Sequence, residues 1–566
     1  MKFSLIARTL LLILLIGACK PKIDDAQLKT EIVSLGLDTG EIALCRSDNT
    51  QFGKVSFDLA CSENAKKDFQ IGAALLHSFE YPEAEKVFAK IIDQDPHCVM
   101  AYWGAAMCNF HPLWEPPSQA DLAKGARVIK LARSLVTDQQ SRESHWLETI
   151  ATIYDQWDSL DHKTRVSKFQ KASEELYLKY PEDNEAAIFY ALALRAASDP
   201  KDKTFVKQKK AGEILNAILS KEPDHPGVAH YIIHVYDYPE LADLGLKSAM
   251  KYASLAAASA HAQHMPSHIF TRLGLWDESI KSNTKSVDAA KCYAENVGIK
   301  GHWDEELHGL DYLMYAHLQQ GDDASALKEF QYFKTIDEVF PMNAKDAYSF
   351  ASLPARYAVE RKDWKSASQL ELVPKGFPWD HYYWERSNID FARFLGDIHS
   401  NNIQDAREHF GQLKMAQQKL ADAKDIYKAN LVLIQVKAAE GWLNLVEGNK
   451  AKAVELMSAA ADLEDATEKH PVSPGSIIPA RELLGDMYLK TGNLLKALNA
   501  YEASLKRNPK KFNSLYGAAY TSEQSGNVDK GIRYYQELIE LAKSSGSNRD
   551  ELTRAEKYIK DHQRSL

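Results

Sequence analysis

Residues 483–509, LLGDMYLKTGNLLKALNAYEASLKRNP, decide the fold of this chain. Leu484, Gly485 and Tyr488 are spaced so that they share one face of a helix. Gly492 then breaks the chain, and a second stripe of small and large apolar residues follows before the closing proline. Small residues let two helices approach closely, while large apolar residues fill the space between them. The stretch therefore predicts a hairpin of two antiparallel helices.

The same pattern recurs along the chain with a period of about 34 residues. The next unit runs from Tyr516 to Leu538 with Gly526 at its break, although Gly531 stands where alanine is usual. More divergent copies contain Tyr81, Ala211, Gly274, Gly321, Trp364 and Gly448. Helix-favouring residues dominate between the breaks. The sequence therefore predicts an all-α solenoid of stacked helical hairpins, a right-handed superhelix with an inner groove.

Three segments rich in proline interrupt this array, at residues 111–119, 372–384 and 468–479. They suggest boundaries between parts of the chain. The predicted parts are a lipoprotein signal peptide (1–18), a tether with an irregular lead-in (19–62), divergent repeats that include a histidine-rich region (63–371), central helical repeats (372–470), and a C-terminal repeat pair with a terminal helix (471–566).

The first residues have the pattern of a lipoprotein signal. Lys2 and Arg8 form a positive start, residues 10–16 are apolar, and Cys19 follows two small residues. The apolar run is shorter than the roughly 20 residues that span a bilayer. We therefore expect Cys19 to be lipidated and to anchor the protein to a membrane, the alternatives being an ordinary cleaved signal or an anchor helix. Lys20 favours the outer membrane, with the protein on its periplasmic face or at the cell surface.

Composition excludes several classes of protein. The chain has 566 residues, of which 45% are hydrophobic and 26% are charged, so it can bury a large core. Its net charge of -9 offers no basic face, so we expect no nucleic-acid partner. The cysteines other than Cys19 are odd in number, which argues against a disulfide framework: Cys45, Cys61, Cys98, Cys108 and Cys292. Cys45 and Cys61 could pair or remain separate thiols.

Histidines are crowded in the middle of the chain. His230 and His234 are one helical turn apart, so their imidazoles project from the same face. His264 and His268 form a second pair, and Pro266 between them suggests the start of a helix. Four neutral imidazoles converging at about 2.1 Å from a centre would suit zinc, copper or another first-row metal. The alternative is ordinary packing, or contact with a peptide in the groove.

The sequence contains no known catalytic motif in a context that would support its usual function. Tyr231 follows His230 where an HExxH metalloprotease has its glutamate. Phosphate-binding loops and serine nucleophile elbows are likewise unsupported. Asp237, Glu305 and Glu306 could act as acids or as hydrogen-bond partners of the histidines. The sequence thus favours a protein without enzymatic activity and identifies no catalytic residue.

Two aromatic stretches could line a ligand groove. Trp103, His111 and Trp114 lie in AYWGAAMCNFHPLW, and residues 379–384 read WDHYYW. Tryptophan and tyrosine more often fill gaps between the helices of repeat proteins, so core packing is the favoured interpretation. Together with His77 and His308, the three residues of the first stretch are the candidate groove residues.

The chain resembles a group of bacterial tetratricopeptide-repeat (TPR) proteins that are often exported. The resemblance rests on LLHSFEYPEAEKVF, AYWGAAMCNFHPLW, HYIIHVYDYPELA, HMPSHIFTRLGLWDESI and PARELLGDMY in this order. It implies a TPR-like fold, protein or peptide binding in a groove, and a shared role for His77, His111, His230, His234, His264 and His268. We therefore predict a membrane-anchored TPR scaffold that binds a protein or peptide partner in the cell envelope. The alternative is a transition-metal-binding protein or metal-dependent enzyme.

Overall fold

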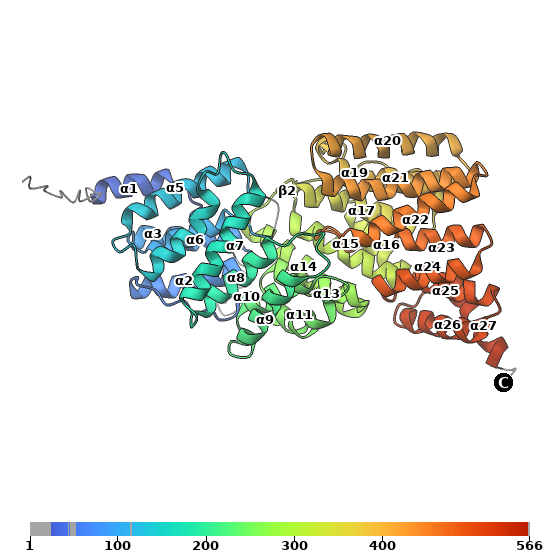
Figure 1. The fold of residues 1–566 in the computed structure, drawn as a ribbon, viewed down its shortest axis with the longest axis horizontal. Helices are drawn as coiled ribbons and strands as arrows, with labels where there is room; N and C mark the ends of the chain where they lie inside the picture. Colours follow the sequence, from blue (N-terminus) through green and yellow to red (C-terminus); the bar gives the residue numbers. More distant parts are fainter. Residues whose placement is uncertain (1–23, 44, 46–51, 114–115, 564–566) are drawn as a thin grey trace, which may run out of the picture.

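The computed structural model shows a protein built almost entirely from helices (Figure 1). It describes residues 24–43, 45, 52–113 and 116–563. The predicted lipidation site, Cys19, and the candidate groove residue Trp114 lie outside these residues. Within the described part, no helix has the length and apolar character needed to cross a membrane.

The described part of the N-terminal half contains fourteen α-helices. They are α1 (Asp25–Ser34), α2 (Glu63–His77), α3 (Tyr81–Gln94), α4 (Val99–Cys108), α5 (Gln119–Leu135), α6 (Arg142–Tyr154), α7 (His162–Lys179), α8 (Asn184–Ala196), α9 (Val206–Leu219), α10 (Pro226–Tyr236), α11 (Ala242–Leu255), α12 (Ala260–His264), α13 (Pro266–Leu273) and α14 (Trp276–Val297).

The C-terminal half continues the array after a short parallel strand pair. The strands are β1 (His302–Trp303) and β2 (Val339–Phe340). The helices are α15 (Asp304–Gln319), α16 (Asp323–Phe333), α17 (Ala344–Val359), α18 (Trp364–Ser368), the 3-10 helix η2 (Trp379–His381), α19 (Tyr383–His399), α20 (Ile403–Asp422), α21 (Ile426–Val446), α22 (Lys450–Ala466), α23 (Ala480–Lys490), α24 (Leu494–Arg507), α25 (Phe512–Gln524), α26 (Val528–Ala542) and α27 (Asp550–Gln563).

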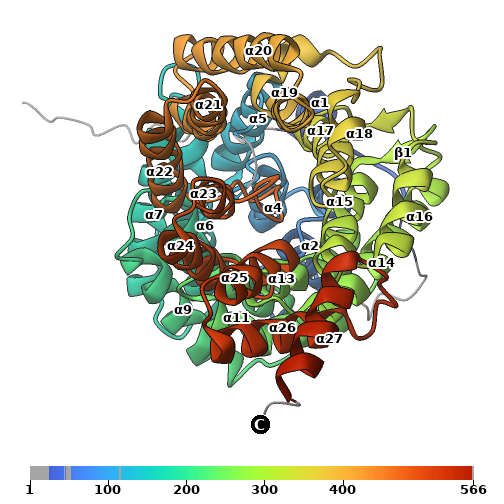
Figure 2. The same ribbon diagram turned by 90° about the vertical axis from the view of Figure 1, so that its right-hand side faces the viewer.

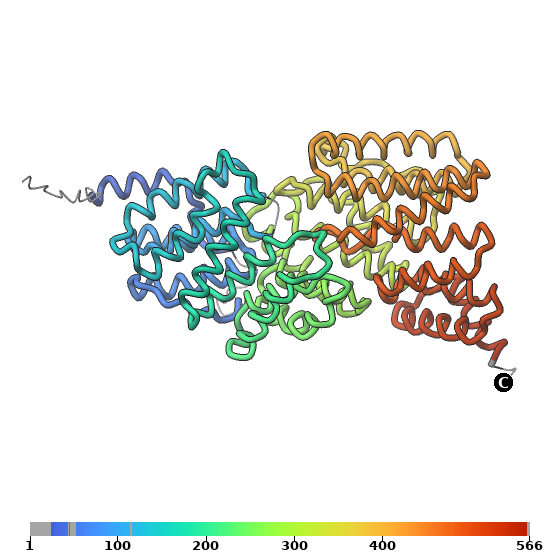
Figure 3. Tube along the Cα trace, viewed as in Figure 1, coloured from blue at the N-terminus to red at the C-terminus, as the bar shows by residue number. Residues whose placement is uncertain are grey.

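Successive helices pack against each other in pairs, such as α2 with α3, α21 with α22 and α25 with α26. The array also curves: α10 contacts α2, and α15 contacts α25, although these helices are far apart in the chain. Viewed along the long axis, the helices are arranged around a central region (Figure 2). The Cα trace runs from the N-terminal end to the opposite C-terminal end (Figure 3). These features confirm the predicted all-α helical solenoid.

The buried apolar residues form several clusters. The largest two extend from Leu28 to Phe270 and from Val287 to Ala500, and a third extends from Ala497 to Ile559. Such a division is expected when each hairpin buries its apolar face mainly against its neighbours. The proposed division of the chain into five parts stays a prediction, since these clusters do not define its boundaries.

The C-terminal hairpins show why the repeat pattern needs small residues. Gly485 on α23 and Gly517 on α25 face the same ring, that of Tyr501 on α24. A β-carbon would lie 2.7 Å from this ring at Gly485 and 2.4 Å from it at Gly517. Both distances are far below van der Waals contact, so the two glycines let the helices approach the tyrosine.

Gly517→Ala is expected to lower the free energy of unfolding by about 1–3 kcal/mol, because the added methyl overpacks the space beside Tyr501. Urea unfolding of the full chain measures the change. Gly411→Ala on α20 is the matched control, since a β-carbon there meets no atom within 4 Å and alanine favours helix. Equal unfolding midpoints for Gly517→Ala and the wild type would contradict this account of the packing.

The described residues of the three proline-rich segments follow α4, α18 and α22, although the second segment contains η2 and the first two residues of α19. Helix α1 occupies ten residues of the segment predicted to be a tether with an irregular lead-in. Asp24 caps this helix by accepting a hydrogen bond from the Gln27 amide. Leu28 is buried, and α1 packs against α3.

Four of the cysteines form two disulfides, which corrects the expectation of no disulfide framework. Cys61 bonds to Cys98, and Cys45 bonds to Cys292. Cys108 is a buried free thiol and accounts for the odd number. Cys45 and Cys61 therefore do not pair with each other. Spacing along the sequence could not reveal the partners, because they are 37 and 247 residues apart and only the packing of α2, α4 and α14 brings them together.

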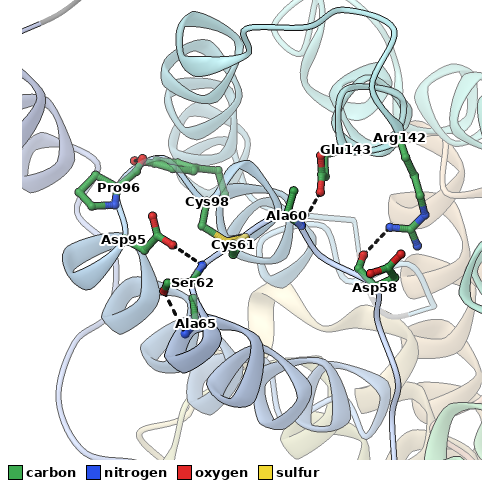
Figure 4. Close-up of a disulfide and its surroundings, with 11 residues drawn as sticks. Asp58, Ala60, Cys61, Ser62, Ala65, Asp95, Pro96, Cys98, Arg142 and Glu143 are labelled. Carbon is green, nitrogen blue, oxygen red and sulfur yellow. Dashed lines mark hydrogen bonds between the residues drawn. A yellow bond between two sulfur atoms is a disulfide. The ribbon is translucent and has the colours of Figure 1, made fainter.

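The Cys61–Cys98 disulfide joins the starts of α2 and α4 (Figure 4). Ser62, the next residue, caps α2 by accepting a hydrogen bond from the Ala65 amide. Its own amide donates to Asp95, 2.9 Å away. The amide of Ala60 donates to Glu143 at 2.7 Å. The disulfide thus closes a junction that hydrogen bonds already fix to α3 and α6.

Replacing Cys61 and Cys98 together by serine is expected to destabilise the protein by about 2–4 kcal/mol, because the unfolded chain regains the freedom of the closed loop. Thermal unfolding under non-reducing conditions measures the loss as a lower Tm. Peptide mapping of the wild type provides the control and should recover the cross-linked pair. An unchanged Tm, or recovery of both cysteines as free thiols, would refute the prediction.

Candidate functional site

Six of the histidines from the middle of the chain meet in the interior. Helix α10 carries His230 and His234, α12 carries His261 and His264, α13 carries His268, and α15 carries His308. The break between α12 and α13 falls at Met265, and Pro266 occupies the first turn of α13, as the sequence suggested. All six side chains are buried or nearly so.

The first triad consists of His230, His234 and His261. The Nε2 atom of His230 lies 3.1 Å from Nε2 of His234 and 3.1 Å from Nε2 of His261. One ring nitrogen from each of the three histidines lies within 4.8 Å of the corresponding nitrogens of the other two. The Nδ1–H of His230 donates to the backbone carbonyl of His77 at 2.7 Å. Since a carbonyl only accepts, the proton of this ring is on Nδ1 and its Nε2 presents a lone pair.

The second triad consists of His264, His268 and His308, whose nitrogens also lie within 4.8 Å of one another. The Nε2 atoms of His264 and His268 are 3.1 Å apart, and the rings of His264 and His308 have centroids 4.2 Å apart. His264 donates from Nδ1 to the Asn283 side-chain oxygen at 2.7 Å. His268 donates from Nδ1 to the Asp237 carboxylate at 2.9 Å. Both rings therefore present a bare Nε2 toward the other.

Burial keeps these rings neutral. It lowers the pKa of His230 to about 3 and lowers the pKa of His264 and of His308 well below the ordinary value. The pKa of His268 is lowered by burial too, although the neighbouring Asp237 opposes the shift. Burial therefore opposes protonation of the rings in both triads.

Aromatic side chains enclose both triads. The ring of Phe79 contacts His230, His234 and His261, with centroids 4.4, 5.5 and 5.4 Å away. Tyr312 lies 4.6, 5.2 and 5.4 Å from the rings of the second triad. Phe79 adopts a left-handed backbone conformation, with φ of 61°, which is strained for a residue with a side chain. This strain occurs where the chain leaves α2 to cover the first triad.

A third cluster, the Glu185 cluster, is built differently. His77 and His225 both donate from Nε2 to the Glu185 carboxylate, at 3.1 and 2.9 Å. The Tyr231 hydroxyl donates to Nδ1 of His77, and the Val228 amide donates to Nδ1 of His225. Burial would raise the pKa of Glu185, but the two histidines lower it to about 2. Every ring nitrogen of this cluster therefore has a protein partner that satisfies it.

The predicted convergence of four imidazoles at one centre needs correction. The structure places His230 and His234 in the first triad, and His264 and His268 in the second. His261 was not selected as a ligand, although it precedes His264 by three residues and so lies near it on one helix face. His308 was placed among the groove residues, and no local spacing connects it with the other histidines.

The other candidate groove residues do not form one surface. Trp103 is 1% exposed and packs against Phe57, Trp146 and Phe189, so it belongs to the core. His111 is half-buried against Tyr81, and His77 is fully buried in the Glu185 cluster.

The three acidic residues singled out from the sequence have separate partners. Asp237 bonds to His268 and, through its other oxygen, to Arg272 at 2.8 Å. Glu305 pairs with Lys345 at 2.5 Å, and Glu306 accepts a hydrogen bond from His302 at 2.9 Å. Only Asp237 therefore acts on a triad.

The segment between α22 and α23, residues 467–479, enters the interior, and we call it the inner loop. The Tyr312 hydroxyl donates to the Ser473 carbonyl at 2.9 Å. Arg356 donates to the Gly475 carbonyl at 2.6 Å. Lys469 approaches the Asp237 carboxylate at 3.5 Å. The inner loop thus occupies the space that the sequence predicted to be an inner groove.

A cavity of about 100 Å³ remains beside the inner loop. Arg272, Lys469 and Arg507 contribute positive charge to its wall, while Tyr348 and Trp384 contribute aromatic surface. Arg272 and Lys469 also contact Asp237, the carboxylate that accepts a hydrogen bond from His268.

Comparisons with known proteins agree with the repeat architecture. Residues 482–547, which extend over the two C-terminal hairpins, match the family described as tetratricopeptide repeat. No curated protein sequence matches the chain. Residues 482–547 therefore form a tetratricopeptide-repeat segment, and the other described helices of the chain continue the helical-hairpin fold.

Three solved structures of TPR-type proteins share low sequence identity and low TM-scores with this chain. The TPR domain of P58(IPK) has 15% identity and a TM-score of 0.21, covering 67% of this chain and 99% of that one. The Cut9-Hcn1 hetero-tetramer of the APC/C has 14% identity and a TM-score of 0.33, with coverages of 87% and 90%. Yeast Tom70 has 14% identity and a TM-score of 0.32, with coverages of 89% and 96%.

Proposed function

We propose that the protein is a lipid-anchored scaffold of the cell envelope that binds a protein or peptide partner. The observation that supports binding is the match of residues 482–547 to the tetratricopeptide repeat, a repeat whose stacked helices form extended binding surfaces. The lipobox ending at Cys19 supports the anchor.

The inner loop restricts where a partner can bind. It fills the interior beside α15 and α17 with backbone of the chain itself, so a second peptide would have to displace it. The C-terminal hairpins leave Tyr488, Tyr516 and Tyr520 partly exposed, and the rings of Tyr516 and Tyr520 stack with centroids 5.9 Å apart. Rigid aromatic side chains of this kind are frequent anchors at protein interfaces. We therefore place the partner site on α23 and α25.

Site-specific photo-crosslinking in intact cells tests this site. A crosslinker introduced at Tyr520 should yield one discrete adduct with a partner protein. The same group at Leu495, which is 72% exposed on α24, is the control for collisions. Adducts of equal pattern from both positions, or none from Tyr520, would reject a partner site on these hairpins.

Fractionation of cells that produce Cys19→Ala tests the anchor separately. The wild type should sediment with membranes, while the variant, which lacks the thiol that would be acylated, should not carry the lipid that retains it. Metabolic labelling with a fatty acid should mark only the wild type. Absence of the label from the wild-type protein would contradict the lipid anchor, and the proposed partner site would be unaffected.

Transition-metal binding is the second candidate function, because the geometry of the two histidine triads favours it independently of the repeats. Three imidazole ligands leave one position of a tetrahedral ion available for water or a substrate, as in catalytic zinc sites. Metal analysis of the protein purified without a histidine tag tests this function. A content far below one ion per chain, before and after incubation with zinc or copper, would reject it.

A further inference from the structure

We propose that the chain binds two first-row transition-metal ions, one ligated by His230, His234 and His261 and the other by His264, His268 and His308. This assignment rests on the second candidate function above and specifies its ligands. It replaces the single four-histidine centre expected from the sequence with two adjacent sites that have three ligands each.

Three nitrogen separations, His230–His234, His230–His261 and His264–His268, match those of ligands around one ion. Two nitrogens bound at about 2.1 Å are roughly 3.0–3.4 Å apart when the angle at the metal lies between square and tetrahedral. The Nε2 separations of 3.1 Å in both triads fall in this range. His264 and His268 use Nδ1 for hydrogen bonds to Asn283 and Asp237, so their Nε2 atoms, 3.1 Å apart, are the nitrogens available to a shared cation.

The contacts of His230 in the first triad also favour a shared ion. The single bare nitrogen of His230 faces two rings, at 3.1 Å each, and one lone pair can accept only one well-directed hydrogen bond. The His230 lone pair can therefore engage only one of the two neighbouring rings by a hydrogen bond. A shared ion accommodates all three nitrogens.

Hydrogen-bond partners around the triads are those of metal-binding histidines. Ligating histidines usually donate their other N–H to a carboxylate, a carbonyl or a similar acceptor, which fixes the tautomer and the ring orientation. His268 donates to Asp237, His264 to Asn283, and His230 to the carbonyl of His77. Arg272 in turn holds Asp237 with a hydrogen bond of 2.8 Å.

The Glu185 cluster provides an internal contrast. It also brings two histidines and a carboxylate within 4.8 Å, but its ring nitrogens all have donors or acceptors from the protein. Hydrogen bonding therefore explains this cluster without an ion. We assign metal to the two all-histidine triads and not to the Glu185 cluster.

The donor set defines the class of metal. Both triads offer only imidazole nitrogen, which suits zinc, copper, iron and nickel, whereas magnesium and calcium prefer oxygen ligands. Zinc and copper are accordingly the probes for the experiment, and magnesium is the negative control.

The test measures metal content and affinity in variants of each triad. Untagged full-length protein, loaded with zinc and freed of excess, should contain about two ions per chain. His261→Gln and His308→Gln should each retain about one ion, and the double variant should retain none. Asp237→Asn should weaken zinc binding at one site by about 10–100-fold and leave the other site unchanged, since Asp237 supports only the second triad.

Two control variants separate ligand loss from unfolding. His97→Ala removes an exposed histidine, and His225→Gln removes a histidine of the Glu185 cluster; both should keep two ions. Circular dichroism verifies that each variant is folded. If the wild type binds metal, loss of all metal in His261→Gln or in His308→Gln alone would indicate one shared centre. An unchanged metal content in the double variant would place the ions elsewhere. Either result overturns the assignment, whereas a metal-free wild type rejects the second candidate function itself.

Discussion

Arg356→Met is expected to destabilise the protein by about 3–5 kcal/mol, because it leaves the buried Asp311 carboxylate without its cation and removes a donor from two carbonyls of the inner loop. Arg356 is fully buried on α17. Its guanidinium donates to Asp311 at 3.2 Å, to the Gly475 carbonyl at 2.6 Å and to the Ser476 carbonyl at 2.9 Å. This one side chain therefore fixes the inner loop to α15 and α17.

Urea unfolding of the variant measures the loss, and limited proteolysis should show new cleavage within the inner loop. Arg356→Lys should restore only part of the stability, since an ammonium group lacks the planar fork of donors. Arg533→Met is the surface control: its partner Glu537 lies 3.7 Å away and both side chains are more than half exposed, so the expected change is within about 0.5 kcal/mol. Equal effects of Arg356→Met and Arg533→Met would refute the role of Arg356.

Lys511→Met is expected to have a similar effect, about 3–5 kcal/mol, because it leaves the Glu360 carboxylate buried without its cation. Lys511 and Glu360 form an ion pair in which both side chains are at most 2% exposed. Asn513 also donates to Glu360 at 2.9 Å. Burial would lower the pKa of Lys511, but Glu360 raises it above the ordinary value, so the lysine is charged. The pair joins the start of α25 to the end of α17.

The loss should appear first at the junction between α17 and the C-terminal hairpins. Hydrogen exchange should therefore accelerate in α25 and α26 more than in α2 and α3. Lys530→Met on α26 is the matched control, since its pair with Glu502 is 39% and 30% exposed and contributes little. Uniform exchange rates across the chain in Lys511→Met would contradict the assignment of this pair to the junction.

The helical hairpins could be predicted because their determinants are local. The apolar stripes recur with the period of a helix, and a glycine marks the break between two helices. Gly485 lies against the ring of Tyr501, as the repeat pattern predicts. The pairs His230–His234 and His264–His268 were also predictable, since residues four apart lie on the same helix face. Their Nε2 atoms are indeed 3.1 Å apart in each pair.

The partners of those histidine pairs were not predictable from spacing. His308 reaches the second triad from α15, and Asp237 reaches it from the end of α10. The disulfide partners and the inner loop share this property, since they depend on contacts between segments far apart in the chain. Such contacts are set by how successive hairpins stack, and a small change in the angle between hairpins would separate the groups.

The sequence alone determined that this chain forms stacked helical hairpins, because apolar periodicity and chain breaks act within one or two turns of helix. Only the tertiary structure decided which histidines form a triad, which cysteines pair and that the inner loop fills the groove. Each of these depends on the curvature of the whole array, which brings α2 back to α10 and the inner loop beside α13 and α15.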